Sequence, residues 1–121
     1  MKQTPLRSKR KYKHKTPYEK AHADAWQIFS RWIRERDKKC CTCPALASQA
    51  GHFYHNYLDF DEQNINGQCS RCNKWLNGNL AVYATYLVET YGASVLKDLE
   101  QRKNKMYSLE ELQEIIIKYS N

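Results

Sequence analysis

The chain has 121 residues and a mean hydropathy of −0.86, and its 20 Lys and Arg side chains outnumber 13 Asp and Glu to give a net charge of +7. No stretch approaches the run of about 20 apolar residues that a membrane-spanning helix needs, and no apolar signal-peptide core opens the chain. We therefore expect neither an integral membrane protein nor a secreted one. We expect a single small domain that needs a stabilising cross-link, such as a bound metal, in addition to its apolar core.

The excess charge is concentrated at the N-terminus. Residues 1–20 carry one acid and eight basic side chains, whereas residues 21–121 carry equal numbers of both. With almost no aliphatic side chains, residues 1–20 cannot bury enough apolar surface to fold, so we predict a disordered basic tail. A basic arm on a neutral body favours contact with the phosphates of DNA or RNA. A solubilising leader, or an electrostatic contact with another protein, is the alternative.

The rest of the chain, residues 21–121, is expected to form one domain. Helical spacing of Ala25, Trp26, Phe29, Trp32 and Ile33 predicts an amphipathic helix over residues 21–38 whose aromatic stripe packs on the core. Residues 39–72 lose the helical period, and residues 50–54 and 65–68 are expected to be the short strands of a hairpin.

Helical pattern returns after the hairpin. It runs from Asn73 to a break at Gly92, and a second short helix follows around residues 95–99. Ser108 and Glu111 form a capping-box pattern that opens a last helix, whose apolar side could supply a homodimer interface. The sequence thus predicts an α+β domain with a cysteine-rich centre flanked by several helices.

Four of the five cysteines are spaced as metal ligands. Cys40 and Cys43 form one Cys-x-x-Cys pair, Cys69 and Cys72 form another, and 25 residues separate the pairs. Two such pairs complete a tetrahedral structural zinc site. Disulfides fit poorly in a chain with no export signal. Cys41 could replace Cys40, but its spacing to Cys43 is a less usual chelate, so we treat it as a spare thiol.

Three polar residues near these pairs have suggestive positions: His52, Asn64 and Asn73. Phosphodiester hydrolysis needs a base for water and a cation against the developing charge. A neutral imidazole can be the base, and an asparagine oxygen can orient it. Singly, each has an ordinary structural interpretation, as a strand histidine, a turn former and a helix cap.

Together they match a known pattern. A Cys-x-x-Cys pair, a strand histidine, an Asn five residues before a second pair, and an Asn opening the next helix resemble the HNH ββα-metal nucleases. The segments 49–53, 60–66 and 68–79 further resemble the lambdoid phage NinG (Rap) recombination nucleases. The resemblance runs from about residue 25 to 119 and does not include the tail.

The resemblance implies a zinc-bound treble-clef ββα-metal (HNH-like) core with a DNA endonuclease site. It places His52 on the general base, Asn64 on its orienting partner, Asn73 on a ligand of a catalytic Mg²⁺ or Mn²⁺, and the four cysteines on the structural zinc. Many HNH enzymes have a second metal ligand just before the base, where this chain has Gly51. His55, Asp59 and Asp61 are candidates for that ligand, with Asp61 favoured. The alternative is that His52 itself ligates the metal and the base lies elsewhere.

We therefore expect a metal-dependent endonuclease that cuts branched recombination intermediates, of the Holliday junction or D-loop type, during phage recombination. Such a protein would be phage- or prophage-encoded and act in the cytoplasm of the host bacterium. The alternative is a zinc-stapled DNA- or RNA-binding protein without cleavage. The two differ in a simple property, because cleavage should stop in EDTA whereas binding should survive it.

Overall fold

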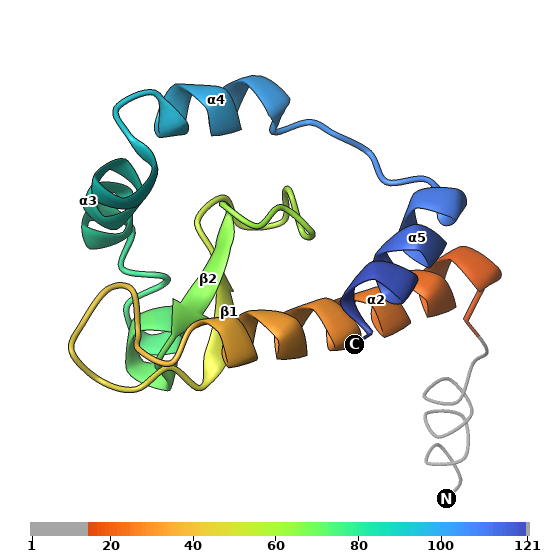
Figure 1. The fold of residues 1–121 in the computed structure, drawn as a ribbon, viewed down its shortest axis with the longest axis horizontal. Coiled ribbons are helices and arrows are strands. Elements are labelled where there is room, and N and C mark those ends of the chain that lie inside the picture. Colours follow the sequence, from red (N-terminus) through yellow and green to blue (C-terminus); the bar gives the residue numbers. More distant parts are fainter. Residues whose placement is uncertain (1–14, 121) are drawn as a thin grey trace, which may run out of the picture.

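The structure, a computed structural model, describes residues 15–120 and begins with helix α2, Pro17–Arg36 (Figure 1). Thr16 caps this helix: its side chain accepts a hydrogen bond from the Glu19 N–H, and the Glu19 carboxylate accepts one from the Thr16 N–H. This capping box, with Pro17 in the first turn, starts the helix four residues before Ala21. Residues 17–20, predicted as disordered tail, are therefore helical, whereas residues 1–14 lie outside the described residues.

Strands β1, Gln49–His52, and β2, Ile65–Gln68, form the expected antiparallel hairpin, with Gln49 opposite Gln68 and His52 opposite Ile65. β1 ends two residues earlier than predicted. The reason is that the N–H of Tyr54 bonds the side-chain oxygen of Asn64 at 2.8 Å instead of a backbone partner. His52 therefore lies at the last paired position of the strand, where the chain turns into a loop.

The helical run predicted from Asn73 to Tyr91 is interrupted. A single π-type turn, η1, covers Arg71–Trp75, and helix α3 begins only at Leu80 and ends at Tyr91. Between them Asn77, Gly78 and Asn79 have φ values of 51°, 92° and 51°. Left-handed residues cannot continue a right-handed helix, which explains the break. Gly92, at φ 106°, ends α3 as expected.

Helix α4, Val95–Arg102, and helix α5, Leu109–Tyr119, complete the described chain. The predicted capping box is present at the start of α5, where Ser108 and Glu111 exchange hydrogen bonds. α5 crosses α2 and packs against it (Figure 1), and Leu112 and Tyr119 are buried. The apolar side of α5, predicted as a dimer interface, is therefore largely covered by α2.

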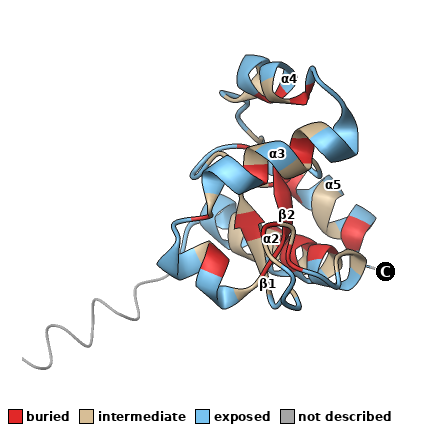
Figure 2. Cartoon of the chain, turned by 90° about the vertical axis from the view of Figure 1, so that its left-hand side faces the viewer, coloured by how far each residue is buried: buried red, intermediate tan, exposed pale blue. Residues whose placement is uncertain are grey.

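Two apolar clusters hold the elements together, and Figure 2 shows buried residues on both strands and on the inner sides of the helices. The first lies between α2, α5 and the hairpin and contains Ala25, Phe29, Ile33, Phe60, Ile65, Leu112 and Tyr119. The second lies between α3, α4 and the loop after β1 and contains Leu58, Tyr83, Leu87, Val95 and Leu99. The aromatic stripe of α2 is thus core, as predicted.

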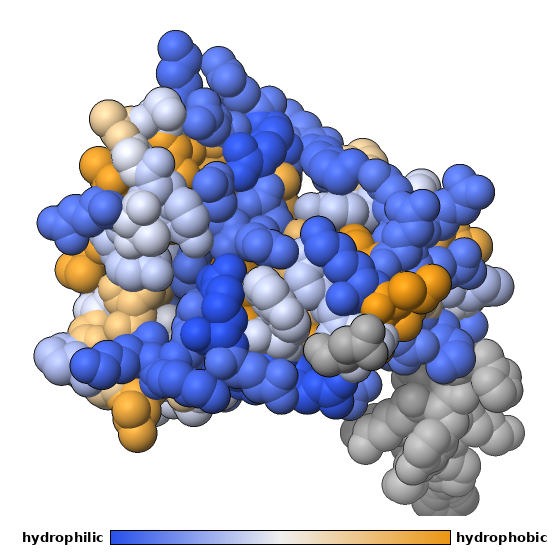
Figure 3. Space-filling view, in the orientation of Figure 1, coloured by the Kyte–Doolittle hydropathy of each residue, from blue (hydrophilic) through white to orange (hydrophobic). Residues whose placement is uncertain are grey.

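The described fold is a set of helices around one small antiparallel hairpin, consistent with the predicted α+β class. Hydrophilic residues cover most of the face seen in Figure 3, with smaller apolar areas between them. Among residues 15–120, no helix has the length and apolar character needed to cross a membrane.

Candidate metal centre and hairpin site

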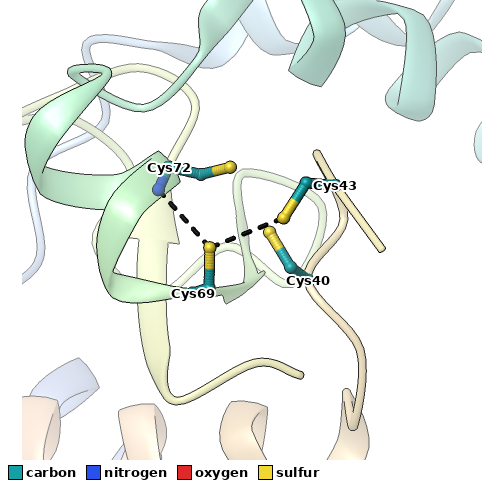
Figure 4. Close-up of side chains that lie close together, drawn as sticks. All are labelled: Cys40, Cys43, Cys69 and Cys72. Carbon is teal, nitrogen blue, oxygen red and sulfur yellow. Dashed lines mark hydrogen bonds between the residues drawn. The ribbon is translucent and has the colours of Figure 1, made fainter. Parts of the chain in front are cut away.

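The four cysteines predicted as zinc ligands converge on one point. The Sγ atoms of Cys40, Cys43, Cys69 and Cys72 all lie within 4.8 Å of one another (Figure 4). The first pair comes from the turn before β1, and the second comes from the junction of β2 and η1. Four thiolates at this spacing match the ligand set of a closed structural zinc site. The cluster can therefore hold a zinc ion that ties the hairpin to η1.

Backbone N–H groups donate hydrogen bonds to two of the four sulfur atoms. The Thr42 N–H points at the Cys40 sulfur at 3.4 Å, and the Cys72 N–H points at the Cys69 sulfur at the same distance. Burial of Cys40 opposes ionisation, but hydrogen bonds from Thr42, the Cys69 backbone and Cys43 together lower the pKa of Cys40 to about 6. The backbone hydrogen bond of Ala45 favours the thiolate of Cys43, but burial and the hydrogen bonds with the other three cysteines of the cluster outweigh it and raise the pKa of Cys43 to about 12. Cys41 lies outside the cluster, and burial raises the pKa of its thiol, consistent with a spare cysteine.

His52 is held by a carboxylate. Its Nε2 lies 2.9 Å from Oδ1 of Asp59, and its ring stacks on Trp26 of α2 at 5.2 Å between centroids. The hydrogen bond from His52 is the main cause of a lowered pKa for Asp59, followed by the opposing effect of burial and the bond from His22. An ionised carboxylate can only accept, so Nε2 is the donor of this hydrogen bond, and Nδ1 is the nitrogen that can act as a base in the tautomer with the proton on Nε2.

Asn64 is completely buried but has a different role from the predicted one. Its side-chain oxygen accepts from the Tyr54 N–H, and its amide nitrogen donates to the carbonyls of Tyr54, Tyr57 and Leu58. These bonds fix the loop between the strands. The orienting contact predicted between Asn64 and His52 is therefore made by Asp59, and Asn64 shapes the loop that carries Asp59.

Asn73 lies against Gly51, the residue before His52. Its amide nitrogen donates to Gln49 at 2.7 Å, which leaves its Oδ1 2.9 Å from the position that a Cβ on Gly51 would take. The Oε1 of Gln68 lies 2.0 Å from that same position. Because strand neighbours point to opposite faces, these oxygens and the His52 ring lie on either side of the end of β1.

The Gln68 oxygen has no partner. Gln68 is completely buried, and its Nε2 donates to Thr42 Oγ1 at 3.0 Å and to the Gly78 carbonyl at 2.9 Å. Since a carbonyl cannot donate, the atom facing Gly78 must be the nitrogen, and Oε1 must face Gly51. Among the buried side-chain atoms of residues 15–120, Oε1 of Gln68 is the one polar atom without a hydrogen bond.

The structure does not favour Asp61 or His55 as the missing ligand. Asp61 forms a two-point ion pair with Arg102 at 2.7 and 3.1 Å and also accepts the N–H groups of Gln63 and Asn64. His55 is exposed, and its Nε2 lies beside Gly78. Asp61, favoured from the sequence, is therefore committed to a structural ion pair, and Asp59 is committed to His52.

Sequence reasoning missed two residues of this site. Gln68 lies within the family-like segment 68–79, but no spacing rule marked a strand glutamine as a ligand. His22 was predicted only as a residue of the first helix, yet its Nε2 lies 2.9 Å from Oδ2 of Asp59. Only the fold brings α2 to the loop after β1.

These features define a small α+β protein with a four-cysteine centre and a His–Asp pair at the end of its hairpin. The chain belongs to the NinG family, as the resemblance predicted: the family model described as Bacteriophage Lambda NinG protein matches residues 2–121. The match therefore also includes the basic N-terminal segment, which the resemblance left out.

Individual relatives agree with this assignment. Protein ninG of Escherichia phage 933W and that of Salmonella phage P22 are each 35% identical to the chain over 105 residues, and that of Escherichia phage lambda is 33% identical. These alignments cover 78% of this chain and 52% of each relative, so the chain spans about half the length of the curated relatives it matches. No solved structure matches the chain.

Proposed function

We propose that this chain is a metal-dependent DNA endonuclease of the HNH ββα-metal type, built on a treble-clef zinc centre. The observation that carries the proposal is the arrangement at the end of β1. There, His52 is fixed by an ionised carboxylate, and two side-chain oxygens meet over the preceding Gly51. A general base and oxygen ligands for a cation are groups that phosphodiester hydrolysis needs, and here they lie on either side of the end of β1.

His52 is the proposed general base. Asp59 accepts the Nε2 proton, and no hydrogen bond occupies Nδ1 within residues 15–120. Nδ1 takes a proton from a water molecule as the water oxygen forms a bond to phosphorus. The bond from phosphorus to the leaving sugar oxygen breaks, and that oxygen is protonated from solvent. The Asp59 carboxylate stabilises the imidazolium that forms.

The hairpin also fits a catalytic Mg²⁺ or Mn²⁺. The Oδ1 of Asn73 and the unpartnered oxygen of Gln68 would hold the ion. The Gln68 oxygen itself fills the space that Gly51 leaves by lacking a side chain, and so comes close to Asn73. Mg²⁺ prefers oxygen ligands and keeps several waters, so two protein ligands are sufficient. When bound, the ion supplies positive charge against the charge that develops on the phosphate. Gln68 is thus proposed for the position that Gly51 leaves open.

Charge and exposure favour DNA as the substrate. Residues 1–20 carry the whole net charge of the chain, and we propose that this segment contacts phosphates. On η1, the turn that carries Asn73, Arg71 and Lys74 are exposed and the Trp75 side chain is 82% exposed. Cations and an exposed indole are typical of surfaces that bind unpaired strands, so branched recombination intermediates are the proposed substrate. This cleavage would act in phage recombination in the bacterial cytoplasm.

The test is cleavage of labelled four-way, flap and linear duplex DNA with Mg²⁺ or Mn²⁺. A positioned general base typically accelerates a reaction by roughly 10²–10⁴-fold, so His52→Ala should slow cleavage by that factor and leave DNA binding in EDTA unchanged. The control is Gln27→Ala, an exposed position on α2. If His52→Ala cuts at the wild-type rate, or if the wild type binds but never cuts, the zinc-stapled nucleic-acid-binding protein is the correct interpretation.

A further inference from the structure

The carboxylate that holds His52 is itself held from its other side. Oδ1 of Asp59 lies 2.9 Å from His52 Nε2, and Oδ2 lies 2.9 Å from His22 Nε2. The two histidines come from different elements, His52 from the end of β1 and His22 from α2, 30 residues apart in the sequence. Asp59 therefore bridges a helix and the hairpin through two charge-assisted hydrogen bonds.

His22 is fixed where it makes this contact. Its ring meets the edge of Phe60, a core residue, at 5.3 Å between centroids. Three residues further along α2, Ala25 is completely buried, so the helix itself is anchored in the first apolar cluster. A ring on an anchored helix has little freedom to move away from Asp59, although its side chain is 37% exposed to solvent.

The same helix also fixes the plane of the His52 ring. Trp26 lies four residues after His22, on the same side of α2, and stacks on His52 with an interplanar angle of 27°. α2 therefore contacts the proposed base twice. One contact is direct, through Trp26, and the other is indirect, through His22 and Asp59.

The three polar side chains do not form a metal site. The two imidazole nitrogens bind different oxygens of the carboxylate, and the cysteine cluster is the only group of three or more close ligand atoms within residues 15–120. A hydrogen-bonded chain, with the carboxylate as the shared acceptor, accounts for both contacts. His22 and Asp59 also line a cleft of about 310 Å³, so the hydrogen-bonded His22–Asp59–His52 series lies at the protein surface beside open space.

We infer that His22 is a positioning residue of the reaction, acting on His52 through Asp59; this inference rests on the proposed nuclease function. A terminal carboxylate rotates freely between broad minima about its last torsion. With Oδ2 bound to His22, the carboxylate keeps Oδ1 directed at His52. The ring of His52 then keeps its Nδ1 directed away from Asp59 and free to accept the proton of water.

The experiment compares steady-state cleavage of branched DNA by the wild type, His22→Ala and His22→Gln, with Gln27→Ala as the matched control on α2. A misplacement of about 1 Å can cost about 100-fold in rate, and a looser carboxylate should cost less, so kcat should fall roughly 10-fold in His22→Ala with KM unchanged. His22→Gln retains an N–H donor at a similar reach, so it should recover most of the rate. In the Asp59→Ala background, His22→Ala should have no further effect, because its action passes through Asp59.

The inference is wrong if His22→Ala cleaves at the wild-type rate. It is also wrong if the losses of cleavage rate in His22→Ala and Asp59→Ala multiply in the double variant. A folded His22→Gln variant as slow as His22→Ala would also refute a role that depends on the hydrogen bond. His52→Ala, measured in parallel, separates the two proposals. If His52→Ala cuts normally the nuclease site itself is wrong, whereas if only His22→Ala cuts normally the nuclease proposal stands and the positioning role fails.

Discussion

Substitution of Gly51 by Ala tests the oxygen pair at the hairpin most directly. An added Cβ would lie 2.0 Å from Oε1 of Gln68 and 2.9 Å from Oδ1 of Asn73. Contacts below 3.0 Å are essentially never observed for a Cβ, so the Gln68 oxygen must move by about 1 Å. That oxygen is the end of a flexible side chain, but the Gln68 side chain is completely buried and its amide nitrogen donates two hydrogen bonds, to Thr42 and to Gly78.

The size of the effect follows from those two hydrogen bonds. Moving the amide by about 1 Å breaks the bonds to Thr42 and Gly78, and each buried group left unpaired costs about 1–3 kcal/mol. We expect Gly51→Ala to lower the free energy of unfolding by roughly 2–4 kcal/mol, a large part of the 5–15 kcal/mol that holds a domain together. For a domain of this size, that corresponds to a fall in Tm on the order of 10–20 °C.

Urea unfolding followed by tryptophan fluorescence measures the change. The control is a double-mutant cycle with Gln68→Ala. Once the Gln68 side chain is removed, the added methyl group has space, so adding Gly51→Ala to Gln68→Ala should lower the free energy of unfolding by less than about 1 kcal/mol. A Gly51→Ala protein within about 0.5 kcal/mol of the wild type, or the same loss in both backgrounds, would refute the assigned geometry. If cleavage by Gly51→Ala depends less on added Mg²⁺ or Mn²⁺ than cleavage by the wild type, at a temperature where the variant is folded, the geometry at Gly51 is linked to the proposed ion.

The zinc centre and the loop between the strands each provide a further prediction. We expect metal analysis to find roughly one zinc per chain in the wild type. Cys69→Ser should lose that zinc and fail to fold, because the free energy of metal binding in such sites is largely folding free energy. Cys41→Ser, the matched control, should keep its zinc, and a folded Cys69→Ser protein without zinc would refute the centre. Asn64→Ala should lower the free energy of unfolding by roughly 3 kcal/mol, because it leaves buried backbone groups of the loop unpaired, and should slow cleavage by loosening Asp59. Asn104→Ala, an exposed control, should do neither, and full cleavage by Asn64→Ala would show that the loop does not position Asp59.

Features encoded by local sequence could be predicted. The cysteine spacing alone indicated the four-sulfur cluster, and the Ser108 capping box placed the start of α5. The hairpin strands were also predicted, because the helical spacing of apolar residues stops before them and returns after them. The start of α2 was missed although the same capping logic applies to Thr16 and Glu19, since the charge of the segment suggested disorder instead.

Partners set by tertiary contacts could not be predicted. The amide of Asn64 could bond either the His52 ring, as predicted, or the loop backbone, and only the loop conformation decides between them. Asp61 and Asp59 are equivalent candidates in the sequence. They differ because Arg102, 41 residues away, takes Asp61 for an ion pair and leaves Asp59 to face His52.

Helix α2 shows why the spacing of His52, Asn64 and Asn73 is not sufficient to describe the site. Phe29 and Ala25 bury one side of the helix in the core, and the adjoining side presents His22 and Trp26 to the loop after β1. The position of the proposed base therefore depends on how α2 packs, and not on the hairpin alone. A change in the core that shifts α2 would move the supports of His52 without altering any residue of the His–Asn–Asn pattern. The proposed catalytic unit consequently consists of the hairpin, the cysteine centre and α2 together.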